Sequence, residues 1–257
     1  MTIYQHFRPE EHEFIDKVLG WKQIVESQYA PKLTDFLDPR EQKIVQSIVG
    51  NHGEISVSFF GGTEQAERKR ALIFPEYFSP EEGDFNLILF EVTYPKKFIV
   101  LEHRNVLGSL MGLGLRREKY GDILADGDCF QFFVTNEIKD YVKMNLDQIG
   151  RASITLEEKP LHEAVQTKEI WRERMITTSS LRLDTILSSF THQSRQKVQN
   201  QIKSGLVKVN WTTVEETSFE CDEGDVISVR GIGRSRIMSV NGKTKKEKWR
   251  ITIGTMN

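Results

Sequence analysis

Residues 194 to 205 carry the clearest helix pattern in the chain. Val198 and Ile202 stand four positions apart, so both fall on one face of a helix and can pack against a core. Ser194 is a good N-cap, because its hydroxyl can accept from the unpaired amides of the first turn. Gly205 suits the end of the helix, because glycine enters the left-handed region without a Cβ clash.

A first short helix is predicted from residue 181, and strands follow the second helix. Residues 206–210 alternate with period two, which is the pattern of a strand. Gly224 and Asp225 signal a tight turn before a further strand. We expect these elements to form a C-terminal domain over residues 181–257.

The first 78 residues predict an N-terminal α+β domain. An apolar stripe at Phe14, Val18, Trp21 and Val25 indicates a first helix. The remaining predicted elements are a helix from Asp38 to Val49, a strand at 54–60, a short helix that is capped by Thr63 and runs through residues 67–70, and a strand at 71–74.

Residues 79–160 show a regular alternation of strands and helices. Strands are predicted at 85–93, 120–125, 129–135 and 152–157, and helices at 103–111 and 136–146. Asp126-Gly127 is a strong hairpin signal between the second and third strands. The order βαββαβ predicts a ferredoxin-like fold of the RNA-recognition-motif kind, so the fold class is α+β. We expect residues 157–178 to be a polar connection to the C-terminal domain.

Composition sets limits on the class of protein. Of the 257 residues 38% are hydrophobic, and no run approaches the ~20 apolar residues that span a bilayer. The first ten residues lack the apolar stretch of a signal peptide, and Cys129 and Cys221 have no metal-site spacing. We therefore expect a cytoplasmic protein with no membrane association, metal or cofactor, and we expect it to act as a monomer.

Charge is distributed unevenly along the chain. Residues 181–257 hold 13 Lys and Arg against 8 Asp and Glu, whereas the net charge of the whole chain is −2. Cations that neutralise phosphates supply most non-specific affinity for RNA. The C-terminal candidates for RNA binding are Arg182, Arg195, Lys203, Lys208, Arg230, Arg234 and Arg236, with Ser194 beside them. Asp184 is a candidate to orient the neighbouring basic groups or to cap the first turn. The basic run at 243–250 could equally be a solvated surface.

The middle domain offers a second set of basic residues. Glycines interleaved with Arg104, Arg116, Arg117 and Lys119 could let backbone amides and guanidinium groups approach a phosphate together. The alternative is that these glycines only form turns. Two further hypotheses concern base stacking by Phe130, Phe132 and Phe133, which could instead be core residues, and an RNA or partner contact by the segment from Gly61 to Arg70.

Several ordered pieces resemble the S4-type RNA-binding domain. They are Arg182-Leu183-Asp184, Ser194-Arg195, Gly205 to Asn210, and Gly224 to Gly231. Trp211 departs from the pattern, because the family often has glycine after the asparagine, and a wider turn is expected there. The resemblance implies that Arg182 and Arg195 occupy positions where this fold presents basic side chains to RNA from its two helices.

The whole chain resembles the bacterial YlmH family. The resemblance rests on Gly61-Gly62 with Ala66 to Arg70, on His103-Arg104-Asn105 with Leu107-Gly108, and on Gly114 to Ile123, ahead of an S4-type domain. It implies a non-catalytic protein that binds ribosomal RNA of the large subunit and tRNA, including peptidyl-tRNA. It also implies support of ribosome-associated quality control, in which stalled chains receive alanine tails, and a gene near cell-division genes.

The sequence argues against three classes of RNA-acting enzyme. The chain lacks the larger catalytic domain of a pseudouridine synthase, the glycine-rich cofactor loop of a methyltransferase and the nucleotide-binding signatures of a tyrosyl-tRNA synthetase. An RNA-modifying enzyme with an unrecognised site around Arg104 to Asp122 stays open, as does a cell-division factor with secondary RNA binding.

Overall fold

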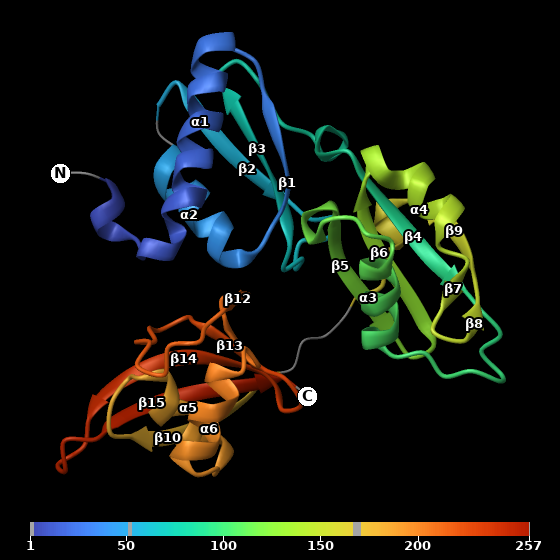
Figure 1. Ribbon diagram of the computed structural model, residues 1–257. Coiled ribbons are helices and arrows are strands. Elements are labelled where there is room, and N and C mark those ends of the chain that lie inside the picture. The colour runs from blue at the N-terminus through green and yellow to red at the C-terminus, as the bar shows by residue number, and fades with distance from the viewer. Residues whose placement is uncertain (1–2, 51–52, 167–170, 257) are drawn as a thin grey trace. The chain divides into compact units, whose positions relative to one another are not determined.

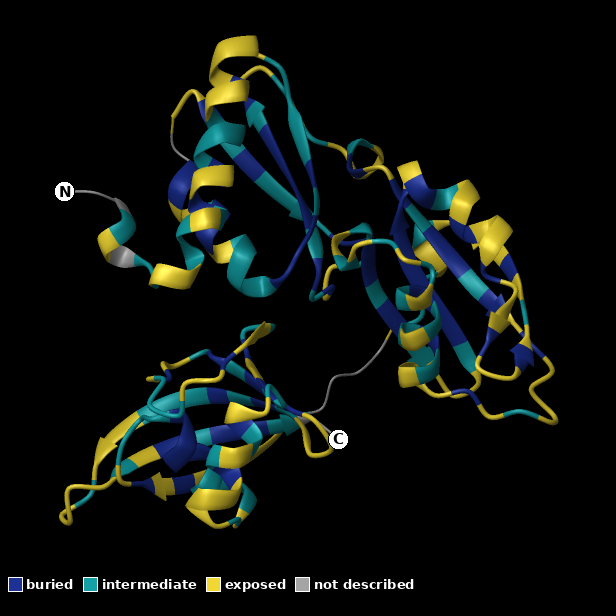
Figure 2. Cartoon of the chain, viewed as in Figure 1, coloured by how far each residue is buried: buried dark blue, intermediate teal, exposed yellow. Residues whose placement is uncertain are grey.

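The structure, a computed structural model, describes residues 3–50, 53–166 and 171–256. The chain divides into two compact units, residues 1–167 and 168–257, and Figure 1 shows the elements of each. Figure 2 shows that buried positions follow the strands and the inner faces of the helices within each unit. Short 3₁₀ turns accompany these elements at Ile3–His6, Pro9–Glu11, Glu82–Phe85, Arg117–Lys119, Asn136–Ile138 and Leu161–Glu163.

The N-terminal sheet has strand order β1-β3-β2 and is antiparallel. Its elements are α1 (His12–Gln28), β1 (Lys32–Leu37), α2 (Pro39–Val49), β2 (Ile55–Phe60) and β3 (Lys69–Pro75). Both predicted helices are confirmed, and Ile15, Val18 and Ile44 bury their apolar faces completely or almost completely. The helix predicted over residues 67–70 is wrong, because these residues form a turn and the start of β3.

Helix α2 begins with a reciprocal capping box. The Asp38 carboxylate accepts hydrogen bonds from the amides of Arg40 (2.8 Å) and Glu41 (2.9 Å), and the Glu41 carboxylate accepts from the Asp38 amide (2.8 Å). Two carboxylates thus share one partly buried site. Burial, and then the negative charge of Asp38, raise the pKa of Glu41 to about 7.

We expect Glu41→Gln to stabilise the protein at pH 8 and to have little effect at pH 4.5. Because the pKa of Glu41 is raised on folding, its carboxyl keeps its proton to a higher pH in the folded state than in the unfolded state. The free energy of unfolding therefore falls as pH rises from about 4.5 to about 7. Glutamine stays neutral and its oxygen can still accept from the Asp38 amide. The midpoint of thermal unfolding should rise by roughly 2–4 °C at pH 8, for about 1 kcal/mol. An equal rise at both pH values would contradict the assignment.

The second sheet has strand order β5-β6-β4-β9 and is antiparallel throughout. Its elements are β4 (Leu87–Thr93), α3 (His103–Gly112), β5 (Tyr120–Asp126), β6 (Cys129–Thr135), α4 (Lys139–Asn145), the small hairpin β7 (Gln148–Ile149) and β8 (Ala152–Ser153), and β9 (Thr155–Lys159). The predicted βαββαβ order is confirmed. Phe90, Phe132 and Val106 lie in the core between this sheet and its helices.

The opposite face of the second sheet is covered rather than open. Leu89 and Phe133 pack in one cluster with Phe36 and Leu72 of the N-terminal sheet, and the segment of residues 161–165 also packs against that cluster. Phe130, Phe132 and Phe133 are all buried, at 4%, 0% and 0% exposure. The hypothesis that they stack RNA bases is therefore wrong, because no ring is accessible.

Gln131 fastens the segment after β9 onto this face. Its Nε2 donates to Glu91 Oε2 (2.9 Å) and to the Glu163 carbonyl (3.2 Å), while its Oε1 accepts from the Val165 amide (2.8 Å). Gln131 is buried, so these bonds satisfy its amide without water. The segment therefore belongs to the packed layer of the first unit.

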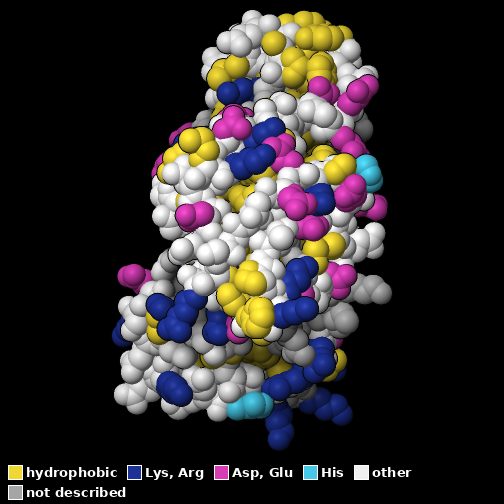
Figure 3. Space-filling view, turned by 90° about the vertical axis from the view of Figure 1, so that its right-hand side faces the viewer, with side chains coloured by type: hydrophobic (Ala, Val, Ile, Leu, Met, Phe, Trp, Pro, Cys, Tyr) yellow, Lys and Arg dark blue, Asp and Glu magenta, His cyan; other side chains and the backbone are white. Residues whose placement is uncertain are grey.

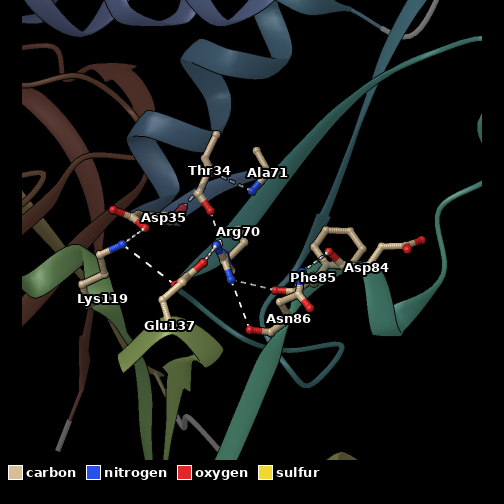
Figure 4. Close-up of polar contacts among 9 residues, drawn as sticks. All are labelled: Thr34, Asp35, Arg70, Ala71, Asp84, Phe85, Asn86, Lys119 and Glu137. Carbon is tan, nitrogen blue, oxygen red and sulfur yellow. Dashed lines mark hydrogen bonds and ion pairs between the residues drawn. The ribbon is translucent and has the colours of Figure 1, made fainter. Parts of the chain in front are cut away.

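Arg70 lies at the centre of the polar junction between the two sheets (Figure 4). Its side chain is 3% exposed. Its Nε donates to the Thr34 carbonyl (2.7 Å), its Nη1 to the carbonyls of Phe85 (3.0 Å) and Asn86 (3.1 Å), and its Nη2 to Glu137 Oε1 (3.2 Å). One guanidinium group thus joins strands β1 and β3 to the start of β4 and to the turn after β6.

Two glycines allow the sheets to approach each other closely at this junction. A Cβ atom on Gly62, whose φ is 95°, would lie 2.2 Å from the Phe133 ring, and one on Gly121 would lie 2.7 Å from the Phe36 ring. Neither space admits a side chain. The Asp122 carboxylate accepts from the amides of Glu67 (2.6 Å) and Arg68 (3.1 Å), which explains why this segment turns instead of forming a helix.

The C-terminal unit is a six-stranded antiparallel sheet with two helices on one face. Its strand order is β10-β15-β14-β13-β11-β12. The elements are β10 (Trp171–Thr178), α5 (Leu183–Thr191), α6 (Arg195–Lys203), β11 (Val207–Val209), β12 (Thr212–Thr213), β13 (Val226–Val229), β14 (Gly233–Lys243) and β15 (Trp249–Met256). Ile186, Val198 and Ile202 of the helices pack with Val207 and Ile253 of the sheet.

The helix signals in this unit are confirmed, and the predicted connection is not. Ser194 caps α6 and its Oγ accepts from the Lys197 amide (3.3 Å), while Gly205 follows the helix with φ 67°. The polar connection predicted over 157–178 is wrong in two places, because β9 ends inside it and Trp171–Thr178 pairs with β15 along its whole length. β10 is an edge strand and carries polar residues on its exposed side, so its sequence does not show the hydrophobic alternation that predicts a strand.

Candidate RNA-binding site

Asp184 organises the basic residues at the start of the two C-terminal helices. Its carboxylate is fully buried and accepts from Arg182 Nε (3.2 Å) and Nη2 (3.3 Å), from Arg195 Nε (2.9 Å) and from Gln199 Nε2 (2.8 Å). Arg182 precedes α5, whereas Arg195 and Gln199 lie one turn apart on α6. A single carboxylate therefore sets the positions of two guanidinium groups that are 13 residues apart in sequence.

The charge of Asp184 is stable at any physiological pH. Burial alone would raise the pKa of this carboxyl, but the hydrogen bonds from Arg182, Gln199 and Arg195 outweigh it and lower the pKa to about 2. The negative charge is compensated by two cations, which is the condition for keeping a charged group inside a fold. Asp184 thus acts as the orienting residue that was one of its two predicted roles.

Both arginines keep an exposed surface for a ligand. The side chain of Arg182 is 35% exposed and that of Arg195 is 52% exposed. A guanidinium group has several donors in a planar fork that matches phosphate geometry. Arg195 is hydrogen-bonded to Asp184 through Nε, and its half-exposed side chain leaves the two Nη groups as donors for a ligand. The two arginines can therefore bind a phosphate while both remain hydrogen-bonded to Asp184.

The rest of α6 extends this surface. Ser194 is exposed at the N-cap position, next to Arg195. Lys203 is exposed in the last turn of the helix, eight residues beyond Arg195 and so about 12 Å further along the axis. Sequence reasoning left Gln199 out of the site, although its i, i+4 spacing from Arg195 placed it on the same stripe. The role of Gln199 becomes visible only in the structure, where its side chain donates to Asp184.

The remaining predicted residues lie on a different face of the unit. Lys208 on β11 and Arg234 and Arg236 on β14 occupy strand positions that alternate with the buried Val207, Val209, Ser235 and Ile237. Their side chains therefore point away from the helices. Arg230 is exposed at the end of β13, and its amide donates to the Leu206 carbonyl after α6 (2.9 Å). The structure thus divides the predicted site between two faces.

The basic run at 243–250 forms the turn between β14 and β15. Lys243 Nζ pairs with Glu247 (3.1 Å) and lies over the Trp249 ring at 5.2 Å from its centroid. Lys245, Lys246 and Lys248 are exposed. On the face drawn in Figure 3, Lys and Arg side chains predominate over Asp and Glu on the C-terminal unit.

Two of the four basic residues in the second set, Arg117 and Lys119, make contacts within the first unit. Arg117 donates to the carbonyls of Tyr120 (2.5 Å) and Gly121 (3.2 Å), and Lys119 pairs with Asp35 (2.6 Å) across the junction (Figure 4). Arg104 is exposed and pairs with Glu102 (2.7 Å), and Arg116 is exposed. In the segment from Gly61, Arg70 is buried as described, so its charge faces the protein interior.

Neither a metal-binding group nor a membrane-spanning helix is found among the described residues. In these parts of the chain, no group of three or more His, Cys, Asp or Glu side chains is placed to hold a metal ion. Of the helices within the same residues, none has both the length and the apolar composition needed to cross a bilayer.

Fold and site together define a multidomain protein that ends in an S4 domain. Family models match residues 10–78 ("YlmH, N-terminal"), 80–163 ("Putative RNA-binding domain in YlmH") and 181–227 ("S4 domain"). The chain is 49% identical over 251 residues to "Ribosome-associated protein quality control protein P2" of Bacillus subtilis (strain 168), covering 98% of this chain and 97% of that protein. It belongs to the YlmH family. A similar solved structure, "Cell division protein ylmH from Streptococcus pneumoniae", has a TM-score of 0.55 and 36% identity over 64% of this chain and 100% of that one.

Proposed function

We propose that this protein is a non-catalytic factor that binds structured ribosomal RNA and tRNA on the large ribosomal subunit. The observation that carries the proposal is the Asp184 cluster, in which Arg182 and Arg195 are held in place and remain exposed. Cations fixed in advance lose little conformational freedom when they bind a phosphate. The match to the S4 domain supports RNA as the ligand.

The relatives support a biological setting for this binding. The name of the Bacillus subtilis relative supports a role in ribosome-associated quality control. We infer that this protein acts in the cytoplasm as a monomer, contacts peptidyl-tRNA on a stalled large subunit, and supports C-terminal tailing of the nascent chain. In the region of the enzymatic alternative, from Arg104 to Asp122, the side chains of Arg117 and Asp122 contact backbone groups of the first unit, which supports a structural role for these two residues.

The proposal is tested by the double variant Arg182→Gln with Arg195→Gln. Glutamine retains a donor that can reach toward Asp184 but has no charge for a phosphate. Sedimentation with purified large subunits should show affinity at least about 10-fold weaker than wild type. The plot of log affinity against log salt should also lose a slope of about two, one unit for each lost phosphate contact.

A matched control removes the same charge elsewhere. Lys17→Gln with Lys43→Gln alters two exposed lysines on α1 and α2, and it should leave both affinity and slope nearly unchanged. If the two double variants lose affinity equally, the effect is one of total charge, and the Asp184 cluster is not the binding site.

A second candidate, a role in cell division, is favoured by the name of the streptococcal relative. A division defect that persists in cells whose variant still binds ribosomes would support it over the ribosomal role.

A further inference from the structure

The turn between β11 and β12 holds a tryptophan in an unfavourable backbone conformation. Val209 pairs with Thr212, so the turn has only the two residues Asn210 and Trp211, and the wider turn expected from the sequence is wrong. Their φ angles are 48° and 67°. Such a turn favours Asn-Gly, because a bulky residue with positive φ is strained. A strained residue that the fold maintains is a candidate for a function.

The strain is maintained by buried groups below the turn, not by the tryptophan. Asn210 Nδ2 donates to Asp225 Oδ1 (2.7 Å), and Asn210 Oδ1 accepts from the Val226 amide (3.0 Å). The other oxygen of Asp225, which is 6% exposed, accepts from the Asp222 amide (2.8 Å). These bonds fix the turn whatever side chain occupies position 211. The Trp211 ring itself is only partly buried, and the Arg234 guanidinium lies 5.7 Å from its centroid.

The tryptophan borders a cationic sheet face. Lys208 lies opposite Ser228, which lies opposite Arg234, so the three side chains form one row across β11, β13 and β14. Alternate strands of a sheet are about 10 Å apart, which sets the spacing between Lys208 and Arg234. Arg236 extends the face two residues further along β14. The charged residues at these positions of the three strands are all cations.

A second aromatic ring lies at the far side of this face. Arg236 pairs across the sheet with Gly254, and a Cβ atom on Gly254 would lie 3.2 Å from the Trp171 ring. The absence of a side chain on Gly254 therefore leaves room for the Trp171 ring beside the strand. The face combines two partly exposed indole rings with the cations Lys208, Arg234 and Arg236, and Glu173 is the one carboxylate on β10 that shares the row of Arg236 and Gly254.

We propose that this face, formed by Lys208, Trp211, Arg234 and Arg236, binds unpaired RNA nucleotides. A base stacks on Trp211, where the face of the indole is supported by Arg234, and flanking phosphates are bound by Lys208 and Arg236. Aromatic rings with surrounding cations are the usual means of holding single strands without sequence preference. The proposal rests on the proposed function in taking RNA as the ligand, but it concerns the sheet face opposite α5 and α6. The C-terminal unit would then contact RNA on two faces at once.

Trp211→Gly tests the proposal without endangering the fold. Glycine relieves the positive-φ strain, so the midpoint of urea unfolding should be unchanged or higher. Affinity for a fluorescein-labelled oligouridine of about ten nucleotides, measured by anisotropy, should fall about five-fold or more. Trp211→Phe keeps an aromatic ring on the same backbone and should retain most of the affinity. If the glycine and phenylalanine variants bind the probe equally well, the stacking role is overturned.

A second variant tests the phosphate contacts on the same face. Arg236→Gln should weaken oligouridine binding and reduce its salt dependence by a slope of about 0.7, the value for a single strand. The two proposals can be refuted independently of each other. Loss of ribosome binding in the Arg182/Arg195 double variant, with undiminished oligouridine binding in Trp211→Gly and Arg236→Gln, would refute this proposal and leave the proposed function standing. Loss of oligouridine binding only in the variants at 211 and 236 would support it, whether or not the ribosomal role holds.

Discussion

Replacing Arg70 with methionine is expected to destabilise the first unit by roughly 3–5 kcal/mol. Methionine is similar in length but donates no hydrogen bond. The carbonyls of Thr34, Phe85 and Asn86 would each lose their charged donor inside the junction, where water cannot readily replace it. A buried polar group left unpaired costs about 1–3 kcal/mol, so three of them account for the estimate.

Urea unfolding followed by circular dichroism measures this loss. Glu137→Gln is the matched control, because it keeps an oxygen that accepts from Arg70 while removing the opposite charge. Glu137 is 53% exposed, so the control should cost less than about 1 kcal/mol. Equal losses in the two variants would mean that the ion pair matters and the carbonyl contacts do not.

Asp184→Ala is expected to weaken both the fold and the RNA site of the C-terminal unit. Arg182, Arg195 and Gln199 all lose their common acceptor, and the two guanidinium groups repel each other without the carboxylate between them. We expect a loss of roughly 2–4 kcal/mol in the free energy of unfolding, since a buried charged partner of cations is removed. Large-subunit affinity should fall as well, although both arginines remain in the chain.

The pH dependence of this loss identifies its cause. The folded pKa of Asp184, about 2, lies below its ordinary value of 3.8, so its stabilisation is fully present above about pH 4 and is lost as pH falls through about 2. Wild type and variant should therefore converge in stability at acid pH. Unfolding can be followed by tryptophan fluorescence in a Trp21→Phe background, where the three remaining tryptophans all lie in the C-terminal unit. A gap between wild type and variant that stays constant from pH 7 to pH 2 would show that packing, not charge, is responsible.

Glu173→Ala is the control for this variant. Glu173 is an exposed carboxylate on β10 of the same unit. Its removal should change stability by no more than about 0.5 kcal/mol.

The elements that the sequence predicts best are those fixed by local contacts. Helices α2 and α6 each begin with a side-chain cap and are followed within two residues by a glycine, so a few neighbouring residues determine their bounds. Strands β1 and β10 were missed because their pattern depends on distant partners. Lys32–Leu37 mixes charged and apolar residues, and it becomes a strand by pairing with β3.

The candidate site shows the same division between local and distant information. The sequence puts Arg195 and Lys203 on one predicted helix, and the resemblance to the S4-type domain groups Arg182 with Arg195. The sequence could not show that Lys208, Arg234 and Arg236 lie on a different face from that group. Successive side chains of a strand point to opposite faces of the sheet, so the exact strand positions are needed to assign a face. Nor could the sequence distinguish the buried Arg70 from an exposed cation, since its partners lie on other strands.

The covered face of the second sheet determines which fragments of the protein can be expected to fold on their own. Residues 80–163 match a family model of their own, yet Leu89 and Phe133 on this sheet face are fully buried, in a cluster that includes Phe36 and Leu72 of the N-terminal sheet. A fragment with those limits would expose an apolar surface that invites aggregation. It would also lack Val165, whose amide satisfies Gln131. The middle segment is better studied together with the first 78 residues and with the chain as far as residue 166.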